Sequence, residues 1–482
     1  SDAALTDPSQ GKQFVLRVPI PASLLKQGTN DLVLTATRGS WLIYDGLVLT
    51  NDPDRTCSDV KITSASLRPT TRFVRSGGKL WQIANLSVQF SESMTSADAV
   101  IYAAGSMRRV LLNSGPLGEA NVEVHLSEVT QPTTVRCAIT CRGQFRTQIF
   151  TFDLKPQRRW SLYVQPSAHV DIGYTDYQER VIKRHNDNMS TALDLCTRYP
   201  GFKWNTEAAW VEDNYLSLMP AAQKADFIKY ARDGRIGCQA IYGNMLTGLL
   251  SHEEIIRSLY YARATATKYG IPFDIAMSSD VPTQVWTLPM ILAGSGIRYY
   301  SAGLNLWRAN SFGRLFGKSP FYWQGPDGSR VMTWLSPGYA QANMLGLANS
   351  VEHAAPRIDD FLRRFERAGY PYDAVLAFGG FGDNQRLNPN LAAVVEQWNA
   401  TYAYPKIILC RGPEFFRAIE KQAVAKKQQP KVLHGDGGVY WEDGAASSAA
   451  ETAMVRTAKE KLVAAEKLHA LVGGPYPTEQ IG

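Results

Sequence analysis

The sequence predicts an α/β protein in which an irregular, barrel-like domain with a parallel sheet follows a β-sandwich region of the immunoglobulin-like type. After Lys155-Pro156, short apolar runs alternate with longer segments of helical apolar spacing, such as residues 176–196 and 251–269. This alternation is typical of parallel strands covered by helices. Before that point, short alternating runs separated by Gly, Asn and Pro indicate antiparallel strands. We therefore expect three parts, at residues 1–54, 55–156 and 157–482.

The composition is that of an ordinary globular protein. The chain has 482 residues, of which 45% are hydrophobic and 20% charged, with a net charge of +7. Lysine and arginine are interleaved with acids, so we expect no nucleic-acid partner. No apolar run approaches the ~18–20 residues of a membrane span, and no signal peptide is visible at Ser1-Asp2-Ala3-Ala4. Of the six cysteines, Cys137 and Cys141 could form a disulfide across a bend, or all six could be buried thiols.

The first 54 residues contain three strand-like runs, at 13–18, 31–37 and 40–49. The run S-W-L-I-Y-D-G-L resembles the end of the jelly-roll module at the C-terminus of rhamnogalacturonan lyases of polysaccharide lyase family 4. Three strands are too few for an independent sandwich. We expect a partial, carbohydrate-binding-like sandwich within a piece of a longer chain; the alternative is that these strands dock onto the next domain.

Residues 55–156 contain about six short strands with turn signals at 76–78 and 113–116, which favours an immunoglobulin-like sandwich. No chemistry stands out there, so a scaffold is expected.

Functional residues are expected in the third part, after its strands. In parallel α/β folds such residues gather at the carboxyl ends of strands. The first strand is expected at 160–164, and further strands at 202–205, 236–242, 275–277, 298–300, 330–335, 374–378, 407–409 and 432–433.

The segment after the first strand, Q-P-S-A-H-V-D-I-G-Y-T-D, contains His169 and Asp171 two residues apart. At an extended strand end this spacing lets both side chains point the same way. An imidazole nitrogen and a carboxylate oxygen together suit zinc or a similar divalent cation. Gly173 allows a sharp turn and Tyr174 offers an aromatic face. The alternative is a buried histidine hydrogen-bonded to an aspartate.

H-x-D-x-G followed by an aromatic residue resembles the opening metal motif of glycoside hydrolase family 38, the α-mannosidases and their relatives. The family usually has Trp where this chain has Tyr174. Further segments match in the same order, so the resemblance covers roughly residues 158–482. It implies a metal-dependent retaining glycoside hydrolase with Zn²⁺ or another divalent cation, acting on a plant or microbial poly- or oligosaccharide. It also implies that the domain is truncated at its C-terminal end.

The resemblance assigns the two catalytic carboxylates. Asp280, just past the strand at 275–277, would be a metal ligand and the nucleophile; the alternative is a helix N-cap. Asp383, in G-G-F-G-D-N, would be the proton donor, although Asn384 stands in place of the family's second acid. The alternative for Asp383 is an Asx turn.

The resemblance also implies a fourth metal ligand. Aligning Gly444 and Ser447-Ser448 with the family places Glu442 where its last metal-binding histidine would stand. A carboxylate there would favour harder ions. The competing positions are His434, Asp436 and Asp443.

Four residues are expected to contact the sugar, namely Tyr174, Glu207, Trp286 and Trp441. His185 is expected on a solvated helix face. Two other functions stay open: a polysaccharide lyase of the rhamnogalacturonan type, and a non-catalytic carbohydrate-binding fragment of a larger enzyme. We further expect a periplasmic or extracellular location, no membrane partner, and either a homo-oligomer or a fragment of a larger chain.

Overall fold

The computed structural model describes residues 20, 24–31, 33, 61–93, 97–141, 147–281, 284–305, 319–436 and 441–476. Most of the partial sandwich predicted for residues 1–54 lies outside these residues. The chain forms two compact units, one of residues 1–159 with 402–404 and one of residues 160–401 with 405–482. No helix in the described ranges is long and apolar enough to cross a membrane.

The first unit contains two antiparallel sheets. One has the order β1-β2-β5, with β1 at Ile62–Ser76, β2 at Lys79–Phe90 and β5 at Glu119–Ser127. The other has the order β4-β3-β6-β7, with strands at Ser106–Leu112, Ala97–Ala103, Thr133–Cys141 and Thr147–Leu154. Alternate residues of both sheets, such as Leu86, Ile101 and Ile139, share one apolar core. The immunoglobulin-like assignment stays a prediction. Cys137 and Cys141 are free thiols.

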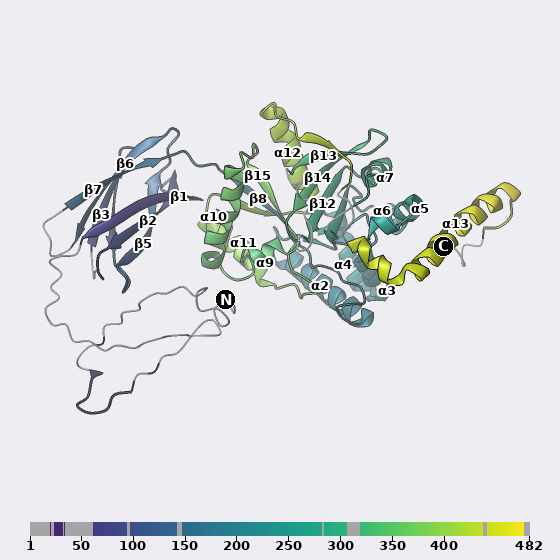
Figure 1. The fold of residues 1–482 in the computed structure, drawn as a ribbon, viewed down its shortest axis with the longest axis horizontal. Helices are drawn as coiled ribbons and strands as arrows, with labels where there is room; N and C mark the ends of the chain where they lie inside the picture. Colours follow the sequence, from purple (N-terminus) through teal and green to yellow (C-terminus); the bar gives the residue numbers. More distant parts are fainter. Residues whose placement is uncertain are drawn as a thin grey trace. The chain divides into compact units, whose positions relative to one another are not determined.

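The second unit has strands at its centre and helices around them (Figure 1). Its largest sheet has the order β11-β12-β14-β13-β17 and is parallel except between β13 and β14. These strands are β11 at Ile275–Asp280, β12 at Tyr299–Leu304, β13 at Phe321–Gln324, β14 at Arg330–Ser336 and β17 at Lys431–His434. The mixed α/β architecture predicted from the sequence is confirmed.

A second sheet places β8 (Ser161–Gln165) between β15 (Ala374–Phe378) and β16 (Lys406–Leu409), all parallel. The short strands β9 (Trp204–Asn205) and β10 (Ile236–Gly237) form a parallel pair. The described strands of the second unit thus form three separate sheets, and the closed barrel that the prediction left open is not found among them.

Helices follow most of the strands. They are α2 Gln178–Arg198, α3 Ala209–Leu218, α4 Ala221–Arg232, α5 His252–Arg257, α6 Tyr260–Tyr269, α7 Leu288–Gly294, α9 Gln341–Met344, α10 Val351–Arg367, α11 Asn390–Thr401, α12 Pro413–Ala425 and α13 Ala449–Val472, with 3₁₀ helices at Thr247–Leu249 (η4) and Trp441–Ser448 (η5).

The helix predicted over 251–269 is two helices. A capping box starts α5, in which Ser251 and Glu254 bond reciprocally, and Gly270 ends α6 with φ +65°. Ser258 and Leu259 lie between the two helices and belong to neither. The prediction missed this break because the apolar spacing continues across it.

Candidate active site

The pairing of β8 with β15 brings two distant loops together. The two strands run parallel in register, with Phe378 opposite Gln165, so they end at the same level. Beyond the strands the loops continue to pair: the backbone N–H of His169 donates to the Phe381 carbonyl at 3.0 Å, and that of Asn384 donates to the His169 carbonyl at 2.9 Å. The H-x-D segment therefore lies beside the segment that contains Asp383.

Three side chains from these loops could hold one ion. His169, Asp171 and Asp383 each offer a donor atom, and the three atoms lie within 4.8 Å of one another. Nε2 of His169 lies 3.0 Å from Oδ1 of Asp171; both side chains are buried, whereas Asp383 is exposed. An imidazole with two carboxylates fits zinc or a similar divalent cation.

Glu207 lies behind the imidazole and is fully buried. Its Oε1 accepts hydrogen bonds from Nδ1 of His169 at 2.8 Å, the backbone N–H of Val170 at 2.9 Å and Nδ2 of Asn244 at 2.8 Å. Such a carboxylate fixes the ring so that Nε2 faces the other ligands. We expected Glu207 to contact sugar hydroxyls, and its place behind His169 differs from that expectation.

The charges in this cluster depend on one another. Burial alone would lower the pKa of His169, but the carboxylates of Glu207 and Asp171 against its two nitrogens raise the pKa to about 10. Burial likewise opposes ionisation of Asp171 and Glu207, and the bonds to His169 still hold the pKa of both carboxyls below their usual range. Without a cation, His169 is therefore an imidazolium between two carboxylates.

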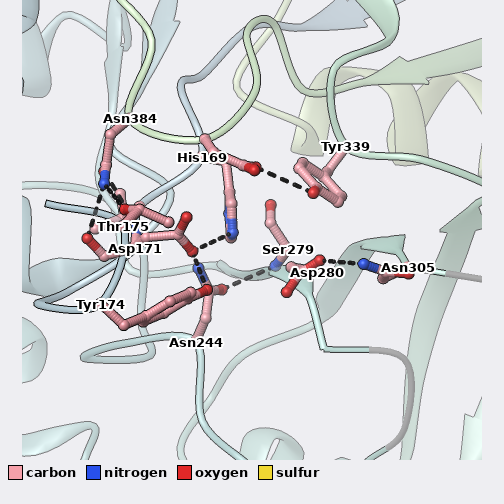
Figure 2. Close-up of polar contacts among 12 residues, drawn as sticks. His169, Asp171, Tyr174, Thr175, Asn244, Ser279, Asp280, Asn305, Tyr339 and Asn384 are labelled. Carbon is pink, nitrogen blue, oxygen red and sulfur yellow. Dashed lines mark hydrogen bonds and ion pairs between the residues drawn. The ribbon is translucent and has the colours of Figure 1, made fainter. Parts of the chain in front are cut away.

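Asp280 ends β11 with φ +66°, a left-handed conformation that is uncommon for a residue with a side chain. Nδ2 of Asn305, which follows the neighbouring strand β12, donates to its Oδ1 at 2.8 Å. The N–H of Ser279 donates to Oδ1 of Asn244 at 2.8 Å, so Asn244 links this strand end to Glu207. Asp280 is not one of the three groups within 4.8 Å of one another, but besides burial its carboxylate contributes to the raised pKa of Tyr339, whose ring packs on His169 (Figure 2).

Aromatic side chains surround these groups (Figure 2). The Tyr339 ring packs on the His169 ring with centroids 4.6 Å apart, and its hydroxyl donates to Oδ1 of Asp383 at 3.1 Å. Burial and the carboxylates of Asp280 and Asp383 raise the pKa of Tyr339. Tyr174 donates to Asp171 from a largely exposed ring, and Nε1 of Trp441 donates to the Asp280 carbonyl at 3.3 Å.

Two further predicted residues outside the three-donor group are Glu442 and Trp286. Glu442 is buried against Gly248, where a Cβ would lie 2.9 Å from its Oε1. The indole of Trp286 donates to the carbonyl of Gln324, at the end of β13.

His185 was expected on a solvated face, and that expectation is wrong. It is buried, and its Nε2 lies 2.9 Å from Oδ1 of Asn384. Sequence reasoning also missed Tyr339, Asn244 and Asn305. Asn305 directly follows β12 and Tyr339 lies just after β14, so a search for polar residues after every strand would have found both.

Comparison with known proteins identifies the class. Residues 159–441 match the model described as the glycosyl hydrolases family 38 N-terminal domain. Because this match covers more than half of the chain, the chain belongs to glycoside hydrolase family 38, and the family expected from the sequence is confirmed. The resemblance of the first residues to a polysaccharide lyase module stays a prediction.

The similar curated proteins include alpha-mannosidase 2C1 of Homo sapiens, 22% identical over 318 residues that cover 63% of this chain and 28% of that protein. The Mus musculus protein of the same name is 21% identical over 323 residues, covering 64% of this chain and 28% of the relative. The chain thus spans less than a third of the length of these relatives.

Among solved structures, an alpha-mannosidase from Enterococcus faecalis V583 aligns with a TM-score of 0.48 and 17% identity, covering 58% of this chain and 31% of that one. A 4-alpha-glucanotransferase from Thermococcus litoralis aligns with a TM-score of 0.40 and 13% identity, covering 62% and 46%.

Proposed function

We propose that this chain carries the catalytic centre of a metal-dependent retaining glycoside hydrolase with an α-mannoside as substrate. The observation that supports it most is the convergence of donor atoms from His169, Asp171 and Asp383, which come from loops more than 200 residues apart in the sequence. Family membership favours hydrolysis over the polysaccharide lyase alternative.

His169, Asp171 and Asp280 are the groups that would hold the cation, and Asp383, whose donor atom lies within 4.8 Å of those of His169 and Asp171, would face the substrate beside it. When bound, a divalent cation would bind adjacent sugar hydroxyls and stabilise charge that develops on them. Glu207 keeps the imidazole in the orientation this needs.

The carboxylates of Asp280 and Asp383 would have different roles, the first as nucleophile and the second as acid/base. Asp280 would attack the anomeric carbon and form a glycosyl-enzyme, from the side chain that Asn305 orients. Asp383 is the exposed member of the donor group, so it can reach a leaving-group oxygen, give it a proton and later take one from water. Tyr339 donates to Asp383 and would hold it toward the substrate.

Metal content is the first test of this proposal. Elemental analysis of the purified chain should find about one divalent ion per chain, which is lost in His169→Ala. His353→Ala, a change of an exposed side chain in α10 that is not part of the donor group, is the matched control and should keep the ion. Full metal content in His169→Ala would contradict the proposed site.

Activity is the second test, with 4-nitrophenyl α-mannoside as substrate. Asp280→Ala should abolish hydrolysis, and sodium azide should restore turnover as the glycosyl azide of inverted configuration, because azide takes the place of the lost nucleophile. A chain that binds metal and mannose without hydrolysis would instead support the carbohydrate-binding alternative. Unsaturated products from pectic fragments would support the lyase.

A further inference from the structure

Asn384 combines a buried polar side chain with a left-handed backbone conformation. It follows Asp383 in the loop after β15, is only 4% exposed, and has φ +48°. Asparagine tolerates this left-handed conformation better than most residues with a Cβ. Two backbone hydrogen bonds also anchor it, from its N–H to the His169 carbonyl at 2.9 Å and from Nη1 of Arg184 to its own carbonyl at 3.1 Å.

The side-chain amide of Asn384 makes two hydrogen bonds with the backbone of Asp171. Its Oδ1 accepts from the Asp171 N–H at 3.1 Å, and its Nδ2 donates to the Asp171 carbonyl at 2.9 Å (Figure 2). The backbone of Asp171 thus presents one donor and one acceptor to the side chain of Asn384. A primary amide satisfies both, whereas an ionised carboxylate has acceptors alone and cannot.

The remaining bonding capacity of the amide is also used. Nδ2 donates to Oγ1 of Thr175 at 2.8 Å, and Nε2 of His185 lies 2.9 Å from Oδ1 and therefore donates to it. The side chain ties together the ligand Asp171, the far end of the H-x-D-x-G-Y-T segment and helix α2. Both amide hydrogens and both directions of the carbonyl oxygen have partners.

We propose that Asn384 is a positioning residue that holds residues 169–175 in the conformation in which His169 and Asp171 face one cation. An ionised acid here would place a carboxylate oxygen next to the Asp171 carbonyl oxygen, and the two would repel each other. The amide of Asn384 is not an acid, so we assign it no proton transfer. The catalytic meaning of this role rests on the proposed function, whereas the conformational role does not.

Residue-resolved hydrogen exchange on the metal-free chain tests the conformational role. Asn384→Asp keeps the size of the side chain and removes both donors. Asn384→Gly keeps the left-handed backbone and removes the whole amide. In Asn384→Gly the Asp171 N–H loses its acceptor and should exchange about tenfold faster or more than in the wild type, since a hydrogen bond worth about 1.4 kcal/mol is lost. In Asn384→Asp a carboxylate oxygen can still accept from this N–H, so the increase should be smaller and come from the lost donors to the Asp171 carbonyl and Thr175. Thr175→Val, at an exposed position, removes one partner of the amide and should give a smaller increase in a chain that folds normally.

Asn188→Asp is the matched control. Asn188 is equally buried and bonds the same loop one step further on, donating to the Gln385 carbonyl at 2.9 Å and accepting from the Leu387 N–H at 2.9 Å. Its replacement should leave the exchange of Asp171 close to the wild-type rate. Acceleration in Asn188→Asp equal to that in Asn384→Gly, or none in Asn384→Gly, would overturn the proposal.

Zinc titration by calorimetry supplies the second measurement. Loss of a group that orients a ligand should weaken Zn²⁺ binding about 10–100-fold in Asn384→Asp and leave Asn188→Asp near the wild type. Unchanged affinity in Asn384→Asp would reject the positioning role. Should the wild type bind no zinc, the proposed function fails, and the exchange comparison still decides the role of Asn384.

Discussion

At the scale of single residues, the site is a set of groups that constrain one another. Tyr339 is the clearest case, because its ring packs on His169 while its hydroxyl bonds Asp383. The phenol therefore touches a metal-binding group and the proposed acid/base at once.

Tyr339→Phe should lower kcat about tenfold to hundredfold, since a hydrogen bond to a charged group is lost, while metal content stays at the wild-type level. Steady-state kinetics with an aryl mannoside and elemental analysis measure both. Tyr372→Phe, which removes a buried hydroxyl bonded to the distant Gln428 carbonyl, is the control and should keep kcat. An unchanged kcat in Tyr339→Phe would show that the hydroxyl does not serve catalysis.

Metal binding should release a proton from His169. In the metal-free protein the pKa of His169 is raised to about 10, so at pH 8 both ring nitrogens carry protons and face carboxylates at 2.8 and 3.0 Å. A cation needs the Nε2 lone pair and must displace one proton. Calorimetric Zn²⁺ titrations at pH 8, in buffers of different ionisation enthalpy, should show about one proton released.

The same raised pKa sets the sign of a stability effect. Protonated His169 stabilises the metal-free fold fully below the unfolded pKa of about 6.5, and this contribution is lost as the pH rises toward 10. The melting temperature of the metal-free chain should fall over that range, and less so in His169→Gln. Identical pH profiles would contradict the imidazolium.

The sequence indicated which residue types follow the strands, but it did not indicate where their side chains point or whether they are buried. His169 and Asp171 were predicted as site residues from their spacing and the family resemblance, and Asp280 and Asp383 from the resemblance; each of the four follows an expected strand. The direction of Glu207 and the burial of His185 depend on partners far along the chain, such as Asn384, 199 residues from His185. No local pattern carries that information.

At the scale of elements, the register between β8 and β15 decides which side chains meet. Gly379 follows β15 with φ +72°, and a Cβ there would lie 1.7 Å from the Tyr339 carbonyl oxygen. The close approach of these two backbones holds Tyr339 over the cluster.

Gly379→Ala should therefore cost on the order of 3 kcal/mol or more in the free energy of unfolding, from strain and a backbone clash together. Gly369→Ala is the control: its φ of +68° imposes the same strain, but nothing lies within 4 Å of the added methyl. It should cost about 1 kcal/mol. Urea unfolding measures both, and equal losses would show that the approach to Tyr339 is not limiting.

The helix and strand rhythm was readable because apolar periodicity is local. The break between α5 and α6 was not, because Ser258 and Leu259 interrupt no apolar pattern. The division into three sheets depends on pairings between distant strands, such as β13 with β17, which a single sequence does not encode locally.

At the scale of the whole molecule, the chain divides into two compact units, and the residues of each unit mainly contact residues of the same unit. The candidate cation site lies wholly within the second unit, whereas the described core of the first unit comes from its two antiparallel sheets. We expect two thermal transitions in calorimetry.

Zn²⁺ at one hundred times its dissociation constant should stabilise only the second unit, by about 2.7 kcal/mol. One transition should move upward in temperature and the other should stay in place. His169→Ala should abolish the shift without altering the transition that zinc leaves unmoved. A shift of both transitions would place the ion elsewhere or couple the units.

Glu207, Asp280 and Asn384 share the left-handed backbone that suits glycine best. Glycine at any of these places would relieve the backbone conformation but remove side-chain hydrogen bonds, such as those of Glu207 with His169 and of Asn384 with Asp171. Variant libraries designed to raise the stability of this protein should therefore leave these three residues unchanged.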